Sequence, residues 1–286
     1  MNPIFSGIGT ALITPFKDDK VDYAALKRII EFQIQNKIDA LVVMGTTGEA
    51  PTLSYDEKIE IAKFAITTVN NHIPVIFGIG GNNPKEIIKL GKKIKESGGR
   101  YVMLSAPYYN KCTQDGAVKF FNDIANEIKL PMIVYNVPGR TGVNLEPQTL
   151  KEIAKNKYIA GIKEASGNMS QIIDVVRLCS DTPVYCGDDG LSLPCYSIGC
   201  VGTISVASNI HPHETRLIWE KRDLKMFHVE QFLYKALFCE PNPIPVKYAM
   251  HLIGFCENEI RAPLTIMSEK STLQYGFREL FKSTRD

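Results

Sequence analysis

One lysine lies near the end of an otherwise apolar segment, which runs from Ile159 to Gly167 and reads Ile-Ala-Gly-Ile-Lys-Glu-Ala-Ser-Gly. If this segment is a buried strand, Lys163 loses hydration, and that loss favours the neutral amine over the ammonium ion. A neutral amine is a nucleophile that condenses with a ketone or aldehyde to give a Schiff base, which then serves as an electron sink. The structural alternative is a lysine whose head group extends from the strand end into solvent.

Hydroxyl groups follow other apolar segments of the chain. The turn Gly45–Glu49 contains Thr46 and Thr47, whose hydroxyl and N–H groups suit a bound carboxylate, although such a turn also leads plainly into a helix. Tyr109 and Tyr135 belong to two further segments, and tyrosine hydroxyls relay protons when a cation or another hydroxyl assists them. The alternative for each tyrosine is a core aromatic ring with its hydroxyl at the rim.

Arg140 lies in the loop after the segment that contains Tyr135, and its planar five-donor group suits a carboxylate. A surface ion pair is the alternative role for this arginine. None of the five histidines falls in these clusters, so neither a Ser-His mechanism nor a metal hydrolase is indicated. Gly7-Ile-Gly9 and Gly78-Ile-Gly80 lack the third glycine or alanine of a dinucleotide fingerprint. We therefore expect no cofactor and no metal.

The composition favours a small-molecule partner. The 286 residues include 33 basic and 31 acidic side chains, a net charge of +2, which excludes a strong electrostatic footprint for nucleic acid or an anionic membrane. The seven cysteines form no C-x-x-C pair and are odd in number, which is typical of reduced thiols rather than a disulfide framework. No signal-peptide pattern and no apolar run of membrane-spanning length is present, so we expect a cytoplasmic protein.

Short β-rich segments alternate with longer amphipathic segments, which is typical of parallel βαβ units. The eight predicted strands are 10–15, 40–45, 74–80, 101–106, 131–136, 159–163, 183–187 and 201–206. Eight strands predict a (β/α)8 TIM barrel over residues 1–222, followed by a C-terminal helical domain over residues 223–286. In such a barrel the active site lies at the C-terminal ends of the strands, where the polar residues above are found.

Helix-capping residues support the prediction that the segments between the strands are helices. Ser54 with Glu57, and Asn168 with Gln171, have capping-box spacing, and Asn83-Pro84 places proline at a first helical position. Two outer-ring helices are predicted from residues at helical spacing, which are Ile59, Ala62, Lys63 and Ile66 in one and Ile87, Leu90, Gly91 and Ile94 in the other. The other predicted helices are 191–198, 214–221, 224–238, 246–256 and 268–281.

Several motifs together resemble the dihydrodipicolinate synthase (4-hydroxy-tetrahydrodipicolinate synthase) family. They span essentially the whole chain: Gly45-Thr-Thr-Gly-Glu49, Ala106-Pro-Tyr-Tyr-Asn110, Tyr135-Asn-Val-Pro-Gly-Arg-Thr-Gly142, Gly161-Ile-Lys-Glu-Ala-Ser-Gly167, Gly187-Asp-Asp189, Gly202-Thr-Ile-Ser-Val206 and Glu240-Pro-Asn-Pro-Ile-Pro-Val-Lys247. The resemblance implies a Schiff-base lyase of the class I aldolase type, which condenses pyruvate with L-aspartate 4-semialdehyde in the diaminopimelate route of lysine biosynthesis.

The resemblance also implies roles for individual residues. Lys163 would form the Schiff base with pyruvate, while Tyr135, Thr46 and Tyr109 would relay protons. Tyr109 would enter the site of a neighbouring subunit, within a homotetramer built from two dimers.

The remaining implied residues bind substrate. Thr47 and Ile204 would line the pyruvate pocket together with Thr46, and Gly187 would lie beside it. Arg140 would position the carboxylate of the semialdehyde.

Two alternatives and one departure accompany this resemblance. The related N-acetylneuraminate and keto-deoxy sugar aldolases share the lysine and tyrosine, but the chain resembles them less at Arg140. A barrel that binds a keto acid as a sensor is a second alternative, although it has no need of a nucleophile. Lysine-inhibited relatives have histidines where this chain has Tyr55 and Lys58, while Asn82, Glu86 and Tyr108 match their effector site. We therefore expect weak or absent inhibition by lysine.

Overall fold

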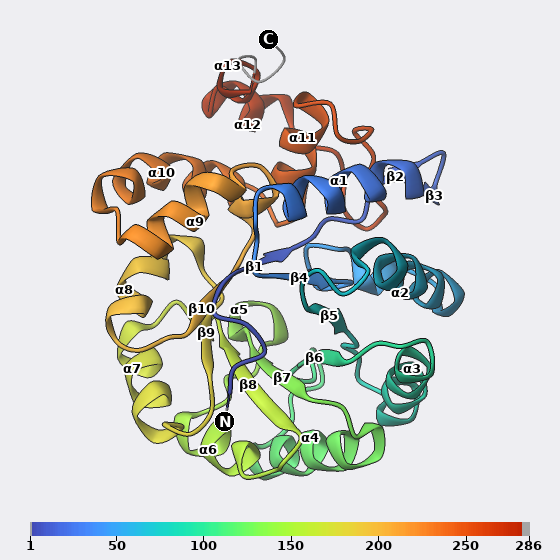
Figure 1. Cartoon of the computed structure of the whole chain (residues 1–286), viewed down its shortest axis with the longest axis vertical. Coiled ribbons are helices and arrows are strands. Elements are labelled where there is room, and N and C mark those ends of the chain that lie inside the picture. The colour runs from blue at the N-terminus through green and yellow to red at the C-terminus, as the bar shows by residue number, and fades with distance from the viewer. Residues whose placement is uncertain (1, 282–286) are drawn as a thin grey trace.

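Eight parallel strands form a closed barrel in the computed structural model, which describes residues 2–281. Neighbouring strands follow the order of the chain, and the last strand pairs with the first, which confirms the predicted TIM barrel (Figure 1). The barrel strands are β1 Gly7–Ala11, β4 Ala40–Val43, β5 Val75–Gly78, β6 Tyr101–Ser105, β7 Met132–Asn136, β8 Ile159–Glu164, β9 Val184–Cys186 and β10 Gly202–Ser205.

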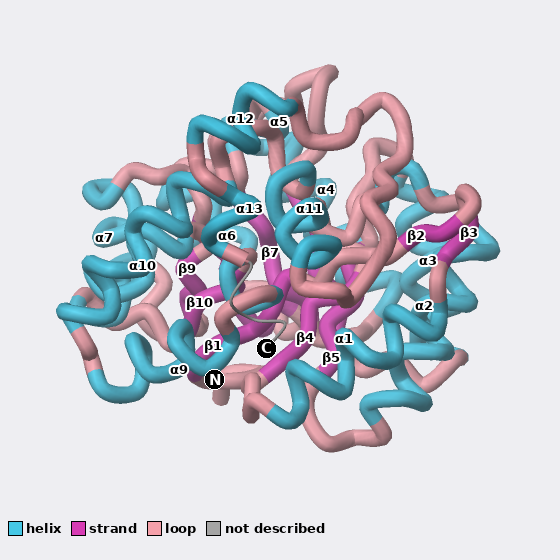
Figure 2. The backbone as a smooth tube through the Cα atoms, turned by 90° about the horizontal axis from the view of Figure 1, so that it is seen from above, coloured by secondary structure: helices cyan, strands magenta, loops and turns pink. Residues whose placement is uncertain are grey.

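Helices surround this barrel in a ring (Figures 1 and 2). The helices between the strands and after β10 are α1 Tyr23–Gln35, α2 Tyr55–Val69, α3 Pro84–Glu96, α4 Gln114–Ile128, α5 Pro138–Thr141, α6 Pro147–Ala154, α7 Met169–Leu178, α8 Ser192–Ser197 and α9 Pro212–Lys221. Short 3-10 turns at 50–52, 189–191 and 207–209 follow three of the strands.

The C-terminal extension is helical, as predicted. Its helices are α10 Leu224–Leu237, α11 Ile244–Leu252, α12 Glu269–Gln274 and α13 Phe277–Leu280. Helix α10 lies beside α9, whereas α11, α12 and α13 lie together beyond the ring, on the side of α1 and α10 (Figure 1). The division of the chain into domains at residue 223 stays a prediction. Of the helices in the described residues, none is long and apolar enough to cross a membrane.

Both helices predicted from helical spacing are confirmed, as α2 and α3. In α3 the four spaced residues Ile87, Leu90, Gly91 and Ile94 are all buried, whereas in α2 Lys63 is exposed and Ile66 is only half-buried. Helix α2 is apolar over a wide arc, and its buried set also includes Ile61, Ala65 and Val69. A wide apolar arc fits more than one helical frame, so the pattern alone does not select the buried one.

The helix caps agree largely with the sequence. The Ser54 side chain accepts from the Glu57 N–H and the Glu57 side chain accepts from the Ser54 N–H, which confirms this capping box. Asn83 caps α3, which begins at Pro84 as predicted. The second capping box is wrong, because Asn168 caps α7 but the Gln171 side chain pairs with Asn144 instead.

Several element boundaries differ from the predictions, and α11 spans residues 244–252 rather than 246–256. The first strand runs over residues 7–11 rather than 10–15, and a small hairpin, β2 Phe16–Lys17 with β3 Lys20–Val21, follows it. Gly7 and Gly9 weaken the strand pattern, yet a Cβ at Gly9 would lie only 2.7 Å from the Phe5 ring, so close packing requires the glycine. The helix predicted over 268–281 is two helices, because Gly276 adopts a left-handed conformation with φ +58°.

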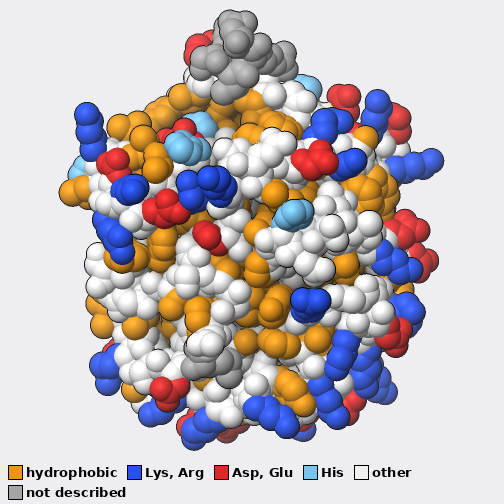
Figure 3. All heavy atoms as spheres, in the orientation of Figure 1, with side chains coloured by type: hydrophobic (Ala, Val, Ile, Leu, Met, Phe, Trp, Pro, Cys, Tyr) orange, Lys and Arg blue, Asp and Glu red, His pale blue; other side chains and the backbone are white. Residues whose placement is uncertain are grey.

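The face of the molecule seen in Figure 3 carries charges of both signs. On the face seen in Figure 3, charged side chains are spread mostly around the edge and hydrophobic side chains gather nearer the middle. This distribution agrees with the small net charge of the chain.

Candidate active site

Lys163 is the penultimate residue of β8, and β8 lies between β7 and β9 in the barrel. Its side chain is only 6% exposed, and its Nζ lies 4.1 Å from the ring centroid of Tyr135 on the neighbouring strand. Among residues 2–281, no carboxylate or carbonyl accepts a hydrogen bond from this amine. The amine is therefore largely removed from water and is not committed to a structural ion pair.

Gly187 follows β9 and makes space for the lysine stem. A Cβ at this position would lie 3.0 Å from Cε of Lys163 and 2.6 Å from Cβ of Ala165. Both distances are too short for a side chain, so any larger residue would displace Lys163 or the strand end. The glycine therefore lets the lysine occupy the barrel mouth.

A cavity of about 430 Å³ opens above Lys163 at the C-terminal ends of the strands. Six of the eight residues predicted for the site line it: Thr46, Thr47, Tyr135, Arg140, Lys163 and Gly187. The other two, Tyr109 and Ile204, are not part of its lining in the described chain. Ile204 is buried within β10, where it pairs with Gly9 of β1. Its role in the pyruvate pocket stays a prediction.

The threonine turn after β4 is held from several directions. Thr14 donates a 2.7 Å hydrogen bond to the carbonyl of Gly48, and the N–H of Gly48 bonds to the carbonyl of Gly45. Thr47 is buried, and its hydroxyl oxygen accepts a 3.0 Å hydrogen bond from Nδ2 of Asn242. The turn therefore presents its hydroxyls to the cavity in a constrained geometry.

Arg140 lies on the short helix α5, immediately after β7, and its side chain is exposed at the mouth of the cavity. One terminal nitrogen donates a 3.0 Å hydrogen bond to the backbone carbonyl of Asn242. This bond uses one of five guanidinium donors and anchors the planar group. The remaining donors are available for a carboxylate that enters the cavity.

Tyr109 lies outside the cavity and is 89% exposed. Its backbone has φ +71°, an uncommon conformation for a tyrosine, and its N–H bonds to the carbonyl of Thr141. The adjacent Tyr108 is also exposed, although the side chain of Asn82 holds its backbone through two hydrogen bonds. The aromatic side chain of Tyr109 thus projects from the surface of the single chain into solvent.

The far wall of the cavity comes from residues to which the sequence analysis gave no role. They are Asp188 and Gly190 after β9, Gln231, Tyr234, Lys235 and Phe238 on or just after α10, and Asn242 in the loop before α11. Burial raises the pKa of the Asp188 carboxyl group above its ordinary value. Two of these residues, Asp188 and Asn242, belong to the motifs Gly187-Asp-Asp189 and Glu240–Lys247. No sequence pattern indicated that α10 contributes side chains to the cavity wall.

A neighbouring cavity of about 480 Å³ contains the residues predicted for an effector site: Tyr55, Lys58, Asn82, Glu86 and Tyr108. Thr46, Tyr135 and Arg140 line both cavities, so the two lie next to each other. Burial lowers the pKa of Lys58 below its ordinary value.

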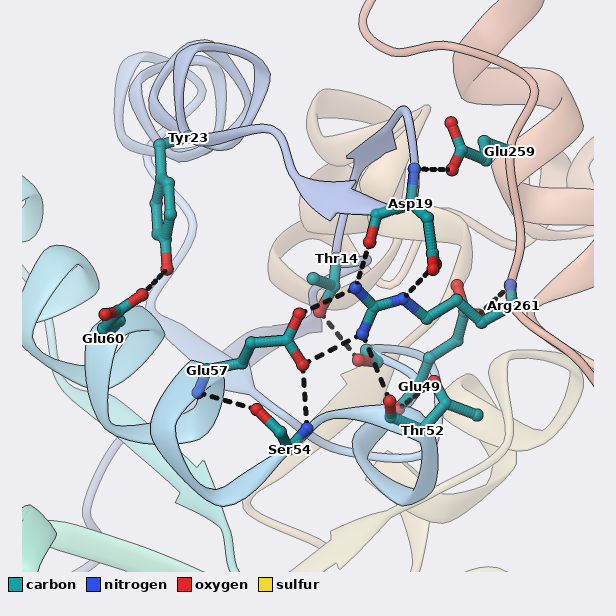
Figure 4. Close-up of polar contacts among 11 residues, drawn as sticks. Thr14, Asp19, Tyr23, Glu49, Thr52, Ser54, Glu57, Glu60, Glu259 and Arg261 are labelled. Atoms are coloured by element: carbon teal, nitrogen blue, oxygen red, sulfur yellow. Dashed lines mark hydrogen bonds and ion pairs between the residues drawn. The ribbon is translucent and has the colours of Figure 1, made fainter.

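The C-terminal extension is joined to the threonine turn by a group of ion pairs. Nζ of Lys247 lies 2.6 Å from Oε1 of Glu49, and the two side chains are 2% and 1% exposed. The other carboxylate oxygen of Glu49 accepts from the Arg261 N–H, while the Arg261 side chain bonds to Glu57 and Asp19 (Figure 4). We call these five residues the C-terminal clamp. The clamp connects the segment that carries Asn242 to the turn that carries Thr46 and Thr47.

A closed ring of eight parallel strands, with a buried unpaired lysine at its mouth and hydroxyls beside it, defines a (β/α)8 barrel of the class I aldolase type. Within residues 2–281, no three His, Cys, Asp or Glu side chains are arranged to hold a metal ion.

Comparisons with known proteins narrow this class. A model of the dihydrodipicolinate synthetase family matches residues 4–277. The chain is 44% identical over 281 residues to the 4-hydroxy-tetrahydrodipicolinate synthase of Caldicellulosiruptor saccharolyticus, and the match covers 94% of each protein. It matches the crystal structure of dihydrodipicolinate synthase from Aquifex aeolicus with a TM-score of 0.94, 39% identity and 98% coverage of each chain.

A further match is the chloride-inhibited dihydrodipicolinate synthase from Acinetobacter baumannii complexed with pyruvate. Its TM-score is 0.93 at 36% identity, with 98% of this chain and 99% of that chain covered. Together with the family model, these relatives show that the chain belongs to the dihydrodipicolinate synthetase family. The resemblance seen in the sequence motifs is confirmed.

Proposed function

We propose that the protein is a 4-hydroxy-tetrahydrodipicolinate synthase, which condenses pyruvate with L-aspartate 4-semialdehyde in the diaminopimelate route of lysine biosynthesis. The single observation that carries this proposal is the buried and unpaired amine of Lys163 at the barrel mouth. The names of the relatives support the substrates, and the Acinetobacter relative was crystallised with pyruvate.

The first half of the reaction takes place at the amine. Nζ of Lys163 attacks the keto carbon of pyruvate, and loss of water gives the imine. A proton then leaves the pyruvate methyl group, because the imine accepts the electron pair and forms an enamine. The enamine carbon attacks the aldehyde carbon of the semialdehyde, and the aldehyde oxygen takes up a proton to become a hydroxyl.

The second half releases the product. The amino group of the semialdehyde attacks the imine carbon, and the bond from that carbon to Nζ breaks, so that Lys163 is regenerated and a six-membered ring leaves. Proton transfers accompany each step, and Tyr135 and Thr46 line the cavity beside the amine. We assign the relay to these two residues together with Tyr109. Arg140, anchored on Asn242, is assigned to the carboxylate of the semialdehyde.

Substrate choice tests this proposal directly. Purified protein is assayed with pyruvate plus L-aspartate 4-semialdehyde and, separately, with pyruvate plus N-acetylmannosamine. We expect turnover with the semialdehyde alone, because Arg140 presents a carboxylate site at the mouth. Turnover only with the sugar would refute the assignment. Binding of pyruvate without a borohydride-trapped adduct would favour the sensor alternative.

We also propose a cytoplasmic homotetramer built from two dimers. All seven cysteines are free thiols, as suits a reducing compartment. The exposed Tyr109 supports a dimer in which each chain completes the relay of its partner, since this side chain lies outside its own cavity.

Mixing two inactive variants tests the shared site. Lys163→Ala and Tyr109→Phe are each expected to be impaired, the second by about 10²-fold through loss of a proton-transfer group. Co-expressed as mixed dimers, they should recover about half of wild-type activity, because one of the two sites in each mixed dimer has both groups intact. Activity is measured after separation of the mixed species. Absence of recovery in verified mixed dimers would contradict a shared site.

Inhibition by lysine is expected to be weak, because Lys58 places a cation in the cavity that a cationic effector would enter. Half-maximal inhibition should require more than about 1 mM lysine, and Lys58→His should lower this concentration about fivefold by removing like-charge repulsion worth ~1 kcal/mol. Lys63→His is the control, since Lys63 is on the same helix α2, is exposed and is not part of the cavity lining. Sub-millimolar inhibition of the unmodified protein would contradict this prediction.

A further inference from the structure

The strand ends that carry Tyr135 and Lys163 also carry a second pair of facing residues. In the ladder between β7 and β8, Tyr135 is paired with Lys163, and Asn136 is paired with Glu164. Successive side chains of a strand point to opposite faces of the sheet. Because Tyr135 and Lys163 line the cavity, Asn136 and Glu164 point outward, toward the ring of helices. Both of these outward side chains are 0% exposed.

The two outward side chains are bonded to each other. Nδ2 of Asn136 donates a 2.9 Å hydrogen bond to Oε2 of Glu164, while Oε1 of Glu164 accepts a 2.8 Å bond from the N–H of Ser166. Nε2 of Gln171, on α7, lies 3.4 and 3.5 Å from the two carboxylate oxygens. Within residues 2–281, no cationic side chain forms an ion pair with this carboxylate. A buried carboxylate held only by neutral donors is costly, so its contribution to stability does not explain its presence.

Further bonds fix the orientation of the Asn136 amide. Its Oδ1 accepts a 3.0 Å bond from the N–H of Leu145, and its Nδ2 also donates to Oδ1 of Asn144 at 3.0 Å. Rotation of the amide by half a turn would lose these bonds, so Nδ2 must face Glu164. The main-chain register of β7 against β8 is irregular between Met132 and Ile133. The side-chain bond at the other end of the strands therefore helps to set their alignment.

We propose that Glu164 is a positioning residue of the reaction assigned to Lys163, because its bond to Asn136 holds the end of β8 against the end of β7. This inference rests on the proposed function. On the cavity side, the alignment places Nζ of Lys163 4.1 Å from the ring centroid of Tyr135. A displacement of about 1 Å between reacting groups can cost about 10²-fold in rate. Glu164 acts through its neighbours, since it is not part of the cavity lining.

Removal of the bond is the first test. Glu164→Leu is compared with the wild type by the rate at which pyruvate forms an adduct on Lys163, stopped at timed intervals with borohydride, and by kcat and KM for the semialdehyde. The adduct rate and kcat should both fall about 10- to 100-fold, because the amine and the tyrosine lose their alignment. KM for the semialdehyde should change less than about threefold, since Arg140 is anchored separately, on Asn242.

Two further variants separate the bond from the charge. Glu164→Gln has no charge but keeps an oxygen that accepts from Asn136, so its adduct rate should stay within about fivefold of the wild type. Glu164→Asp keeps the charge but is one methylene too short for this bond, so it should be slowed as much as Glu164→Leu. A faster rate in Glu164→Asp than in Glu164→Gln would show that the carboxylate acts through its charge, and would overturn the inference. This comparison stands even if Glu164→Leu does not fold.

A buried polar residue elsewhere controls for general loss of stability. Gln33, on α1, is 0% exposed, bonds to Thr10 and to the carbonyl of Ser208, and does not line the cavity. Gln33→Leu should lower the midpoint of thermal unfolding while the adduct rate stays within about twofold of the wild type, because the altered contacts are distant from β7 and β8. Equal slowing in Gln33→Leu and Glu164→Leu would overturn the positioning role.

The adduct also separates failure of this inference from failure of the proposed function. No adduct in the wild type would refute the proposed function itself. With a wild-type adduct present, an unchanged adduct rate in folded Glu164→Leu would overturn the inference alone. A higher KM for the semialdehyde without slower adduct formation would overturn it too, because Glu164 would then act on the segment that follows Arg140 rather than on Lys163.

Discussion

Replacement of Lys163 by alanine is expected to lower kcat by about 10⁴-fold or more, the scale of losing a covalent nucleophile. Borohydride reduction with pyruvate should add the pyruvyl mass to wild-type Lys163 and add nothing to the variant, as measured by mass spectrometry of the peptide. The fold should remain intact, because no hydrogen bond or ion pair within residues 2–281 depends on this amine. The variant therefore separates catalysis from stability.

Lys235→Ala is the matched control, since Lys235 also lines the cavity but belongs to α10 rather than to the barrel. This variant should still form the adduct on Lys163. An adduct that persists in Lys163→Ala, or that disappears only in Lys235→Ala, would place the nucleophile elsewhere. Unfolding of Lys163→Ala would contradict the view that the lysine has no structural role.

Much of the catalytic half of the site was predictable from the sequence. A single lysine in an apolar segment indicates a buried amine, and polar residues after successive strands converge because the C-terminal ends of barrel strands meet. Thr46 follows β4, Tyr135 lies within β7, and Arg140 follows β7. As expected from these positions, all three line one cavity with Lys163. Local pattern and barrel geometry suffice for residues of this kind.

The C-terminal half of the site was not predictable in the same way. An amphipathic helix has an inward face, but its pattern does not say which neighbour that face meets. Helix α10 follows the eighth barrel strand and still contributes Lys235 to the mouth. Asn242 lies between two prolines, a context typical of a rigid link, and its contacts with Thr47 span 195 residues of sequence.

The same limit applies to the C-terminal clamp. Glu49, Lys247 and Arg261 are far apart in the sequence, and a salt bridge between distant residues has no periodic signature. Glu49 has φ +52°, an uncommon conformation for glutamate, which directs the chain sharply away from the threonine turn. The clamp compensates for this turn with contacts that only the folded chain brings together.

Removal of either partner of the buried Lys247–Glu49 pair is expected to lower the free energy of unfolding by about 3–5 kcal/mol. Burial lowers the pKa of Lys247 and the Glu49 carboxylate opposes this effect, so loss of Glu49 leaves an uncompensated buried amine. Glu49→Ala and Lys247→Ala are measured by denaturant titration with the wild type. Lys119→Ala is the control, because it breaks an exposed Lys–Asp pair and should cost about 1 kcal/mol or less.

The clamp should also be sensitive to acid. Arg261 lowers the pKa of Glu57 from 4.5 to about 2 through paired hydrogen bonds, although solvent screens this partly exposed pair. Because the folded-state pKa lies below the unfolded one, the contribution of Glu57 is complete above about pH 4.5 and is lost as the pH falls toward 2. Glu57→Gln should flatten the fall in stability over this range. A pH profile of stability in Glu57→Gln identical to that of the wild type would contradict this prediction. A loss of unfolding free energy in Glu49→Ala no larger than that in Lys119→Ala would contradict the preceding one. Either result would show that the C-terminal helices are held to the barrel by apolar packing instead.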